Sequence, residues 1–554
     1  MTPSPRWSDR GRRVAAAGRL APGLVLFACV VLPWLNPFAP GPSAWVGPWL
    51  FSAMCAGLAF ALKGSGRPQW PVAAFLGGLS AWAALRTGWS PETLALAAAC
   101  LLVWMMATLA ADTPDRDGFI RLIAVAWVLA AVVSTAAALL QYFGAADWLA
   151  PWVNHSTGGE AYANLRQRNQ FASLTVIGMA AILWLAGRGV ARWPAMLAMA
   201  WMAAGNAATT SRTGLLELLL FGSVVWWWGG LRSPRTRLWL AGLAAYLAAA
   251  VALPLLAQVL TGEPANSLWT RVSTGESCGS RIVLWSNVLA LIAERPWLGW
   301  GWGELDFAHY TTLYGGTRFC DILDNAHNLP LHLAVELGKP AAVALCTAIA
   351  VAVWRGRPWR EGDDIRQLAW TVLLVLGVHS LLEYPLWYGP FQMTLGLALG
   401  ILWPAAAPTQ RLAARAGASP AGLALTLGFL SAAGYAAWDY FRASQIYLPP
   451  ERRAAGWQQD PLARLGGSWL FRSQVRFANL TLTPVTRDNA ARMHEEAVDL
   501  LHYSPEPAVI ERLLDSAVAL KREEEVLLHL ARFRTAFPQA YATWVQRHRR
   551  PAPG

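Results

Sequence analysis

The chain has 554 residues, of which 55% are hydrophobic and only 14% are charged, whereas soluble domains carry roughly 25% charged residues. The formal net charge is +12, but the arginines fall in short clusters between apolar runs, so the basic balance predicts membrane topology and excludes nucleic acid as the partner. The 32 tryptophans favour the same class, because indole rings prefer membrane interfaces. We therefore expect an all-α, polytopic integral membrane protein.

The first segment, MTPSPRWSDRGRR, is basic and has no small-residue cleavage site after the first apolar run, which predicts a retained cytoplasmic tail. Apolar runs long enough to cross a bilayer, roughly 20 residues each, recur from Leu20 to about Trp438. About 13 transmembrane helices are predicted, at 20–38, 44–62, 70–86, 91–112, 120–143, 170–187, 193–210, 213–230, 237–260, 328–354, 367–385, 386–405 and 419–438.

The segments between these runs alternate in charge. Basic segments should face the cytoplasm; they are 62–68, 187–192, 231–237, 354–366 and the arginines near 411–415. The opposite, outer side then receives 144–169, 209–213, the long loop 261–327, the turn near 379–390 and everything after the last span. All the polar motifs described below fall on this outer side.

The composition changes after residue 440, where hydrophobicity drops and helical periodicity appears. Segments 487–503, 507–520 and 522–537 are predicted as amphipathic helices, loosely like a tetratricopeptide array. The sequence thus predicts a membrane domain over 1–439, with the outer loop 261–327 included, and an outer helical tail over 440–554.

The cysteines divide by location. Cys278 and Cys320 are the only pair in an outer loop, and a disulfide between them is expected if that side is oxidising. The other four lie in apolar runs as small packing residues: Cys29, Cys55, Cys100 and Cys346.

The stretch from Asp321 to Gly338, DILDNAHNLPLHLAVELG, places a histidine at the mouth of a predicted membrane helix. Polar, titratable groups there are functional candidates. His327 can act as a base, and Asp324 or Glu336 could orient it. The alternative is a polar helix cap whose histidine meets lipid headgroups.

Three outer segments carry arginine, which the charge asymmetry should exclude from this side. They are AYANLRQRNQFAS at 161–173, TTSRTG at 209–214 and CGSRIVLWSNVLALIAERPWLGWGWGELDF from Cys278. Any one arginine could anchor to lipid phosphate, but three such segments beside a histidine suggest a bound polyanion, because guanidinium pairs with phosphate bidentately. A further outer motif, HSLLEYPLWYGPF at 379–391, is either an interfacial aromatic belt or a source of tyrosine hydroxyls and sugar-stacking rings.

Together, NLRQRNQFAS, TTSRTG, the Arg281 segment and AHNLPLHLAVELG resemble the O-antigen ligase and polymerase superfamily of bacterial inner membranes. HSLLEYPLWYGPF and the helical tail are similar to its PglL-type protein O-oligosaccharyltransferases. The resemblance covers most of 150–400 and the tail. It implies transfer of an oligosaccharide from undecaprenyl diphosphate to a hydroxyl of a periplasmic or pilin-like protein at the inner membrane, without a cofactor or metal.

The resemblance also implies roles for individual residues. His327 is the expected catalytic residue, as the base or as the group that orients the acceptor hydroxyl. The residues expected to bind the donor diphosphate or glycan are Gln167, Arg166, Asn164, Arg212 and Arg281. Those expected to contact the acceptor or a sugar are Tyr384, Tyr388, Glu383, His379 and Glu336, and the spacing does not decide between the two tyrosines.

Three other readings remain open at this point. Asp321, Asp324 and His327 are spaced so that a helix would align them as a cation site, although nearby arginines make a bridging cation less necessary. Within the same enzyme class, the acceptor could be a lipid A core or a growing glycan. From another class, the chain could be a transporter of lipid-linked glycan.

Overall fold

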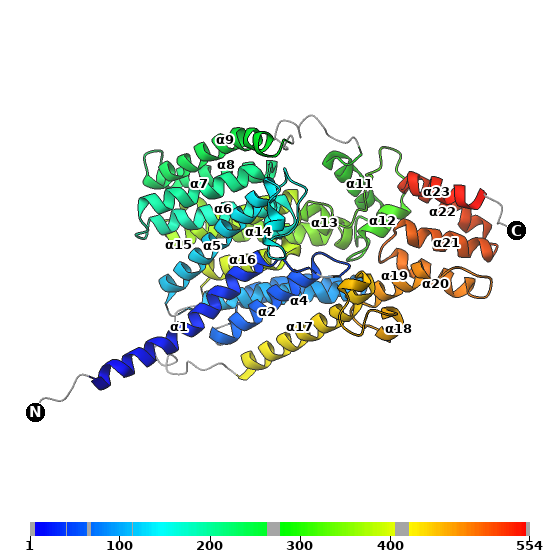
Figure 1. Ribbon diagram of the computed structural model, residues 1–554, viewed down its shortest axis with the longest axis horizontal. Coiled ribbons are helices and arrows are strands. Elements are labelled where there is room, and N and C mark those ends of the chain that lie inside the picture. Colours follow the sequence, from blue (N-terminus) through cyan, green and yellow to red (C-terminus); the bar gives the residue numbers. More distant parts are fainter. Residues whose placement is uncertain are drawn as a thin grey trace, which may run out of the picture.

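The computed structural model describes residues 6–39, 41–63, 68–113, 115–262, 278–404 and 420–549. Within these ranges the regular structure is entirely helical, which confirms the predicted all-α fold. Figure 1 shows most of the apolar helices side by side along the long axis of the molecule, with the last helices gathered at one end.

The helices before the outer loop are α1 (Arg6–Leu35), α2 (Val46–Lys63), α3 (Trp70–Thr87), α4 (Pro91–Ala111), α5 (Arg116–Tyr142), α6 (Arg168–Ala186), α7 (Arg192–Ala208), α8 (Arg212–Gly229) and α9 (Pro234–Thr261). The loop itself contains α11 (Arg281–Glu294) and α12 (Leu305–Thr311). After it come α13 (Leu329–Leu337), α14 (Lys339–Gly356), α15 (Asp364–Leu382), α16 (Gly389–Leu402) and α17 (Pro420–Tyr447).

Every predicted span falls on a helix. Among the described residues, 7 helices are long and apolar enough to cross a membrane, namely α4, α5, α6, α9, α14, α15 and α17, and shorter apolar helices lie at Ala21–Leu35, Val46–Leu62 and Gly389–Leu402. The protein is therefore polytopic.

One predicted span, 328–354, is wrong as a single helix. It breaks at Gly338 into α13 and α14, where the backbone has a φ of +89°. A Cβ atom at this position would collide with the carbonyl group of Trp297. Glycine alone fits both the left-handed backbone and the close approach.

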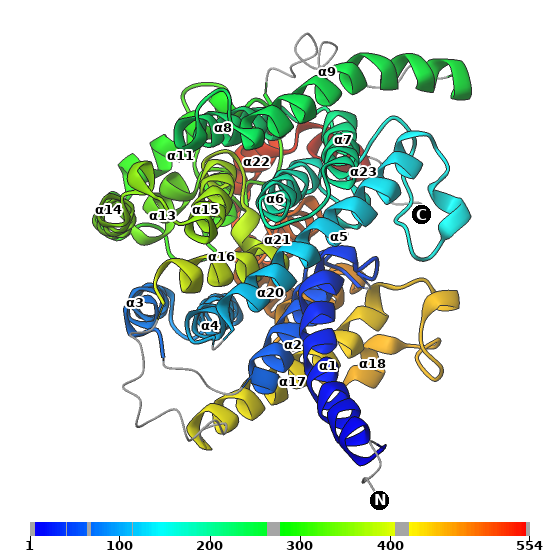
Figure 2. The ribbon, with the colours of Figure 1, turned by 90° about the vertical axis from the view of Figure 1, so that its left-hand side faces the viewer.

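The central helix of the bundle is α6, which Figure 2 shows surrounded by α5, α7, α8 and α15. Of the residues in the apolar stretch of α6, 89% are buried, because the neighbouring helices cover it on all sides. In contrast, only 6% of the residues in the apolar stretch of α14 and 17% of those in α17 are buried. Both helices lie at the edge of the molecule in Figure 2. Such exposed apolar faces are typical of helices that contact lipid or another protein.

Three of the predicted basic segments meet at one end of the bundle through ion pairs. Arg188 lies 2.7 Å from Asp364, Arg235 lies 3.5 Å from the same carboxylate, and Arg116 lies 3.3 Å from Asp363. These contacts join segments 187–192, 231–237 and 354–366. The arginines near 411–415 and most of segment 62–68 lie outside the described residues. The polar motifs of the outer side gather at the other end, as described below.

The tail consists of α18 (Pro461–Leu465), α19 (Arg472–Leu482), α20 (Ala490–Leu501), α21 (Pro507–Ala519), α22 (Glu523–Ala536) and α23 (Pro538–Arg549). The three predicted amphipathic helices correspond to α20, α21 and α22. Their core also contains Tyr310 of α12, so the tail packs against the outer loop. Because α17 runs unbroken to Tyr447, the division at 439/440 falls within a helix and stays a prediction.

Candidate active site

Three helices begin, at the end of the bundle that the sequence predicts to be outer, with a capping residue followed directly by an arginine. Side-chain oxygens of Gln167, Ser211 and Ser280 accept hydrogen bonds from backbone N–H groups and cap α6, α8 and α11. The next residues are Arg168, Arg212 and Arg281. Helix N-termini carry partial positive charge, so together with the adjacent cationic side chains they favour the binding of an anion.

The Glu383 carboxylate, directly after α15, is the centre of the site. Its Oε2 atom lies 2.7 Å from Nδ1 of His327, and its Oε1 atom accepts hydrogen bonds from Arg281 and, at 2.8 Å, from Asn169. Burial opposes the charge, but the hydrogen bond with His327 and the nearby Arg281 charge hold the pKa of Glu383 below its usual value. Glu383 is therefore a buried carboxylate with three partners.

Asn169 connects this carboxylate to a further helix. Its Oδ1 atom accepts a hydrogen bond of 2.6 Å from the Ser211 hydroxyl, which also caps α8. Four elements thus meet at the site: α6, α8, α11 and the end of α15. The sequence alone indicates no role for Asn169 or Ser211, although both lie in the arginine-bearing segments 161–173 and 209–214.

The backbone around His327 is fixed by three side chains. His327 has a φ of +49°, and its N–H donates to Asn325 at 2.9 Å. Trp285 donates to the carbonyl of Ala326 at 3.0 Å, and Asn328 donates to that of Leu381 at 3.0 Å. A left-handed histidine is uncommon and points to a functional constraint.

The His327 ring is 28% exposed, and its Nδ1 atom is taken by Glu383. Nε2 has no partner among the described residues, so this nitrogen is the one that can face a substrate. An imidazole held at one nitrogen by a carboxylate is a common arrangement for a general base.

Two predictions about His327 are wrong. Its partner is Glu383, not Asp324 or Glu336. The chain from Asp321 to Asn328 is irregular, and α13 begins only at Leu329, so the two aspartates and His327 do not share a helix face. The described parts of the chain contain no cluster of three metal-ligating side chains.

The two tyrosines lie at different depths. The rings of Tyr384 and His327 form a T-shaped pair with centroids 4.9 Å apart. The ring of Tyr388 stacks on that of Tyr384, with centroids 6.0 Å apart. Tyr388 is only 8% exposed. Burial and the negative charges of Asp324 and Glu383 raise the pKa of Tyr384 to about 12, so its phenol stays protonated and can donate.

Two of the predicted donor-binding residues are engaged elsewhere. The Asn164 amide donates to the carbonyl groups of Leu35 and Trp152, at 2.8 and 2.9 Å. Arg166 donates to Pro37 and Asn154. These contacts fasten the end of α1 to the loop before α6.

His379 and Glu336, predicted to contact acceptor or sugar, are both buried. His379 is 0% and Glu336 is 1% exposed. His379 bonds to Ser173 within the helix bundle, and Glu336 lies 3.4 Å from His332 on α13. Neither can reach a substrate in this arrangement.

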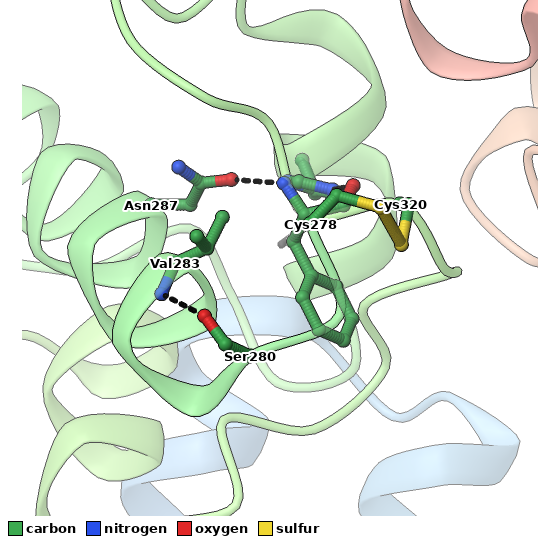
Figure 3. The surroundings of a disulfide bond; sticks show 7 residues. Cys278, Ser280, Val283, Asn287 and Cys320 are labelled. Carbon is green, nitrogen blue, oxygen red and sulfur yellow. Dashed lines mark hydrogen bonds between the residues drawn. A yellow bond between two sulfur atoms is a disulfide. The ribbon is translucent and has the colours of Figure 1, made fainter. Parts of the chain in front are cut away.

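Cys278 and Cys320 form the expected disulfide bond. Figure 3 shows it next to the start of α11, where the Ser280 hydroxyl accepts from the N–H of Val283. The bond therefore ties the segment that precedes Arg281 to the segment that leads into His327.

Three models of known protein families match successive parts of the chain. The model described as protein glycosylation ligase matches residues 161–186, the one described as O-antigen ligase matches 197–346, and the C-terminal model of a virulence factor membrane-bound polymerase matches 367–552. The predicted family resemblance is confirmed. The three matched regions contain Gln167, Arg212, Arg281, His327 and Glu383.

The individual relatives are distant. A general O-oligosaccharyltransferase of Acinetobacter baylyi is 24% identical over 312 residues, which are 53% of this chain and 52% of the relative. An O-antigen ligase of Pseudomonas aeruginosa is 27% identical over 282 residues (50% and 61%), and a ComP-specific O-oligosaccharyltransferase of Acinetobacter baylyi is 22% identical over 250 residues (45% and 44%). The chain spans about half the length of the curated relatives it matches.

Proposed function

We propose that the chain is a glycosyltransferase that moves an oligosaccharide from undecaprenyl diphosphate to a serine or threonine hydroxyl of a periplasmic or pilin-like protein. The observation that carries the proposal is the Glu383 carboxylate, which joins a base, His327, to an anion-binding cation, Arg281. The proposed location is the bacterial inner membrane, with this end of the bundle in the periplasm.

The donor diphosphate would bind where the arginine-led helices begin. Arg212 is exposed and Arg281 is partly exposed, so both can reach a ligand. Negative charge grows on the diphosphate as its bond to the sugar breaks, and fixed cations stabilise that transition state most. Gln167, at the start of α6, is proposed to hold donor oxygens.

In the transfer step, the acceptor hydroxyl oxygen attacks the anomeric carbon while the bond from that carbon to the diphosphate oxygen breaks. The hydroxyl proton passes to Nε2 of His327, and undecaprenyl diphosphate leaves with the bonding electron pair. Glu383 holds Nδ1 and stabilises the imidazolium that forms. A positioned base contributes about 10²–10⁴-fold to such a step, and direct displacement inverts the anomeric centre.

A second candidate acceptor is a lipid A core. The similarity to an O-antigen ligase of Pseudomonas aeruginosa and the match over 197–346 favour it. The same donor chemistry would serve both acceptors, so the acceptor must be identified by experiment.

The test uses purified protein, a lipid-linked oligosaccharide, and either a candidate protein or a lipid A core as acceptor. We expect His327→Ala to abolish transfer while donor binding persists. Arg281→Lys should weaken donor binding instead, because the ammonium group of lysine cannot reproduce the bidentate hydrogen bonds of a guanidinium with phosphate. His155→Ala is the matched control, since His155 is also bonded to a carboxylate, Asp147, but lies in another outer segment.

Transfer at a near-normal rate by His327→Ala would overturn the proposed mechanism. Movement of labelled glycan across a vesicle without covalent transfer would instead support a transporter.

A further inference from the structure

A second polar cluster lies inside the helix bundle, deeper than Glu383. Its members are Ser173 of α6, Glu217 of α8 and His379 of α15, and each is at most 1% exposed. The Ser173 hydroxyl lies 2.8 Å from both carboxylate oxygens of Glu217 and 2.8 Å from Nδ1 of His379. The proposed transfer mechanism uses none of these three groups.

The cluster repeats the connections of the outer site on the same helices. Ser173 is one helical turn from Asn169, and His379 is one turn from Glu383. Glu217 is further along α8 from Ser211. The two layers together fasten α6, α8 and α15 at two depths, so a shift in the inner layer changes where Asn169, Ser211 and Glu383 meet.

Hydrogen-bond capacity makes Ser173 the essential link. A hydroxyl has one proton to donate and two lone pairs to accept with. Ser173 can therefore connect Glu217 and His379 only by donating to one and accepting from the other. Without this hydroxyl, two buried polar groups lose their partner, which is costly in a bundle interior.

We propose that Ser173, Glu217 and His379 are positioning residues, which hold α6, α8 and α15 in the register that places Glu383 against His327. The proposal rests on the proposed glycosyl transfer for its catalytic consequence. Among the described residues, the side chains nearest His379 include Ser173, Glu217 and the ring of Phe391, at 5.6 Å between centroids. The charged side chains of Glu383 and Arg281 also interact with it. The cluster is closed to solvent, so it acts through hydrogen bonds and not by contact with a substrate.

The first test compares three variants of the full chain in the transfer assay. Ser173→Ala and Glu217→Leu should lower kcat about 10- to 100-fold, as expected for misplaced catalytic groups. KM for the donor should change less than kcat, because Arg281, one of the proposed donor-binding residues, lies on α11 and not on a helix that the cluster fastens. Glu217→Gln should keep at least about half of kcat, because its amide can donate to Ser173, which then donates to His379.

The matched control is Thr175→Val. Thr175 also lies buried on α6 and accepts a hydrogen bond of 2.8 Å from the side chain of Asn206 of α7. Among the described residues, neither of these two side chains bonds to Ser173, Glu217, His379 or Glu383. Loss of the bond between Thr175 and Asn206 should leave kcat of the folded protein unchanged. The proposal is overturned if Ser173→Ala keeps the normal kcat, if Glu217→Gln fails as completely as Glu217→Leu, or if Thr175→Val fails equally.

A second test needs no enzymatic activity. Cysteines introduced by Asn169→Cys and Ser211→Cys replace a pair whose side-chain oxygens lie 2.6 Å apart, so they should cross-link on oxidation. Adding Ser173→Ala should lower the cross-linking yield, and adding Thr175→Val should not. If the unchanged chain transfers no glycan, the proposed function fails, but the cross-linking experiment still tests the positioning role. An unchanged cross-linking yield after Ser173→Ala would refute that role.

Discussion

Glu383 is a single buried carboxylate shared by a base and a cation. Its bond to Arg281 uses one nitrogen of the guanidinium that the donor diphosphate is proposed to need, and two anions on one arginine would repel each other. We infer that the donor competes with Glu383 for Arg281. The bond to His327 uses the other carboxylate oxygen and can persist.

The change that separates these two roles is Glu383→Gln. A glutamine oxygen can still accept a hydrogen bond from Nδ1 of His327, but it no longer stabilises an imidazolium by charge. We expect kcat to fall about 10²-fold, and the donor Kd to stay equal or become lower because repulsion is removed. Transfer rates and donor binding on the same purified variant measure both effects.

Asp147→Asn is the matched control for this change. It removes the same charge from an exposed carboxylate that lies 2.8 Å from His155, and it should alter neither kcat nor donor binding. A Glu383→Gln protein with normal kcat would contradict the charge argument.

At the scale of the elements, features that depend on local sequence were predicted, whereas some features that depend on contacts between distant segments were missed. Hydropathy located the helices, because a span needs a long apolar run whatever its neighbours are. The break at Gly338 escaped detection, since it depends on the approach of Trp297 from another segment. The motifs named His327 and Glu383, but nothing local indicates that residues so far apart in sequence pair.

The Cys278–Cys320 disulfide links two of these elements, and its removal is expected to loosen the site. By chain entropy, a closed loop with a sequence separation of 42 contributes up to ~4 kcal/mol to the free energy of unfolding. The double variant Cys278→Ser and Cys320→Ser should unfold at lower denaturant concentration and transfer glycan more slowly, because Arg281 and His327 lose their shared tether.

Cys346→Ser is the control, since Cys346 is a partly buried free cysteine of α14. Peptide mass mapping of the oxidised protein should find Cys278 and Cys320 joined. Free thiols at both positions would contradict the pairing.

At the scale of the whole molecule, the tail is docked on the outer loop close to the site. Tyr310 of α12 is buried in the tail core and lies 2.9 Å from Nδ1 of His529. His502, at the end of α20, bonds to Glu304 of the loop at 2.7 Å and stacks on Phe307. The tail can therefore influence the loop that carries Arg281 and leads to His327.

This contact should depend on pH in a definite direction. The hydrogen bond with Glu304 raises the pKa of His502 above its ordinary value of 6.5. A histidine whose folded-state pKa is raised stabilises the folded contact fully below its ordinary pKa, and this contribution is lost as pH rises through the raised value. Burial instead lowers the pKa of His494, and that of His529 to about 4, so their contributions change only as pH falls below the ordinary value.

Above about pH 6.5, the docking of the tail should therefore weaken with rising pH, chiefly through His502. Amide hydrogen exchange across α20 and α12, corrected for the intrinsic pH dependence of exchange, should show protection falling over this range. His502→Gln should remove most of the slope, because glutamine keeps a donor toward Glu304 but does not titrate. His155→Gln, an exposed histidine outside the tail contact, should leave the slope unchanged. Protection that rises with pH in the unchanged protein, or a slope that survives His502→Gln, would show that this ion pair does not fasten the tail.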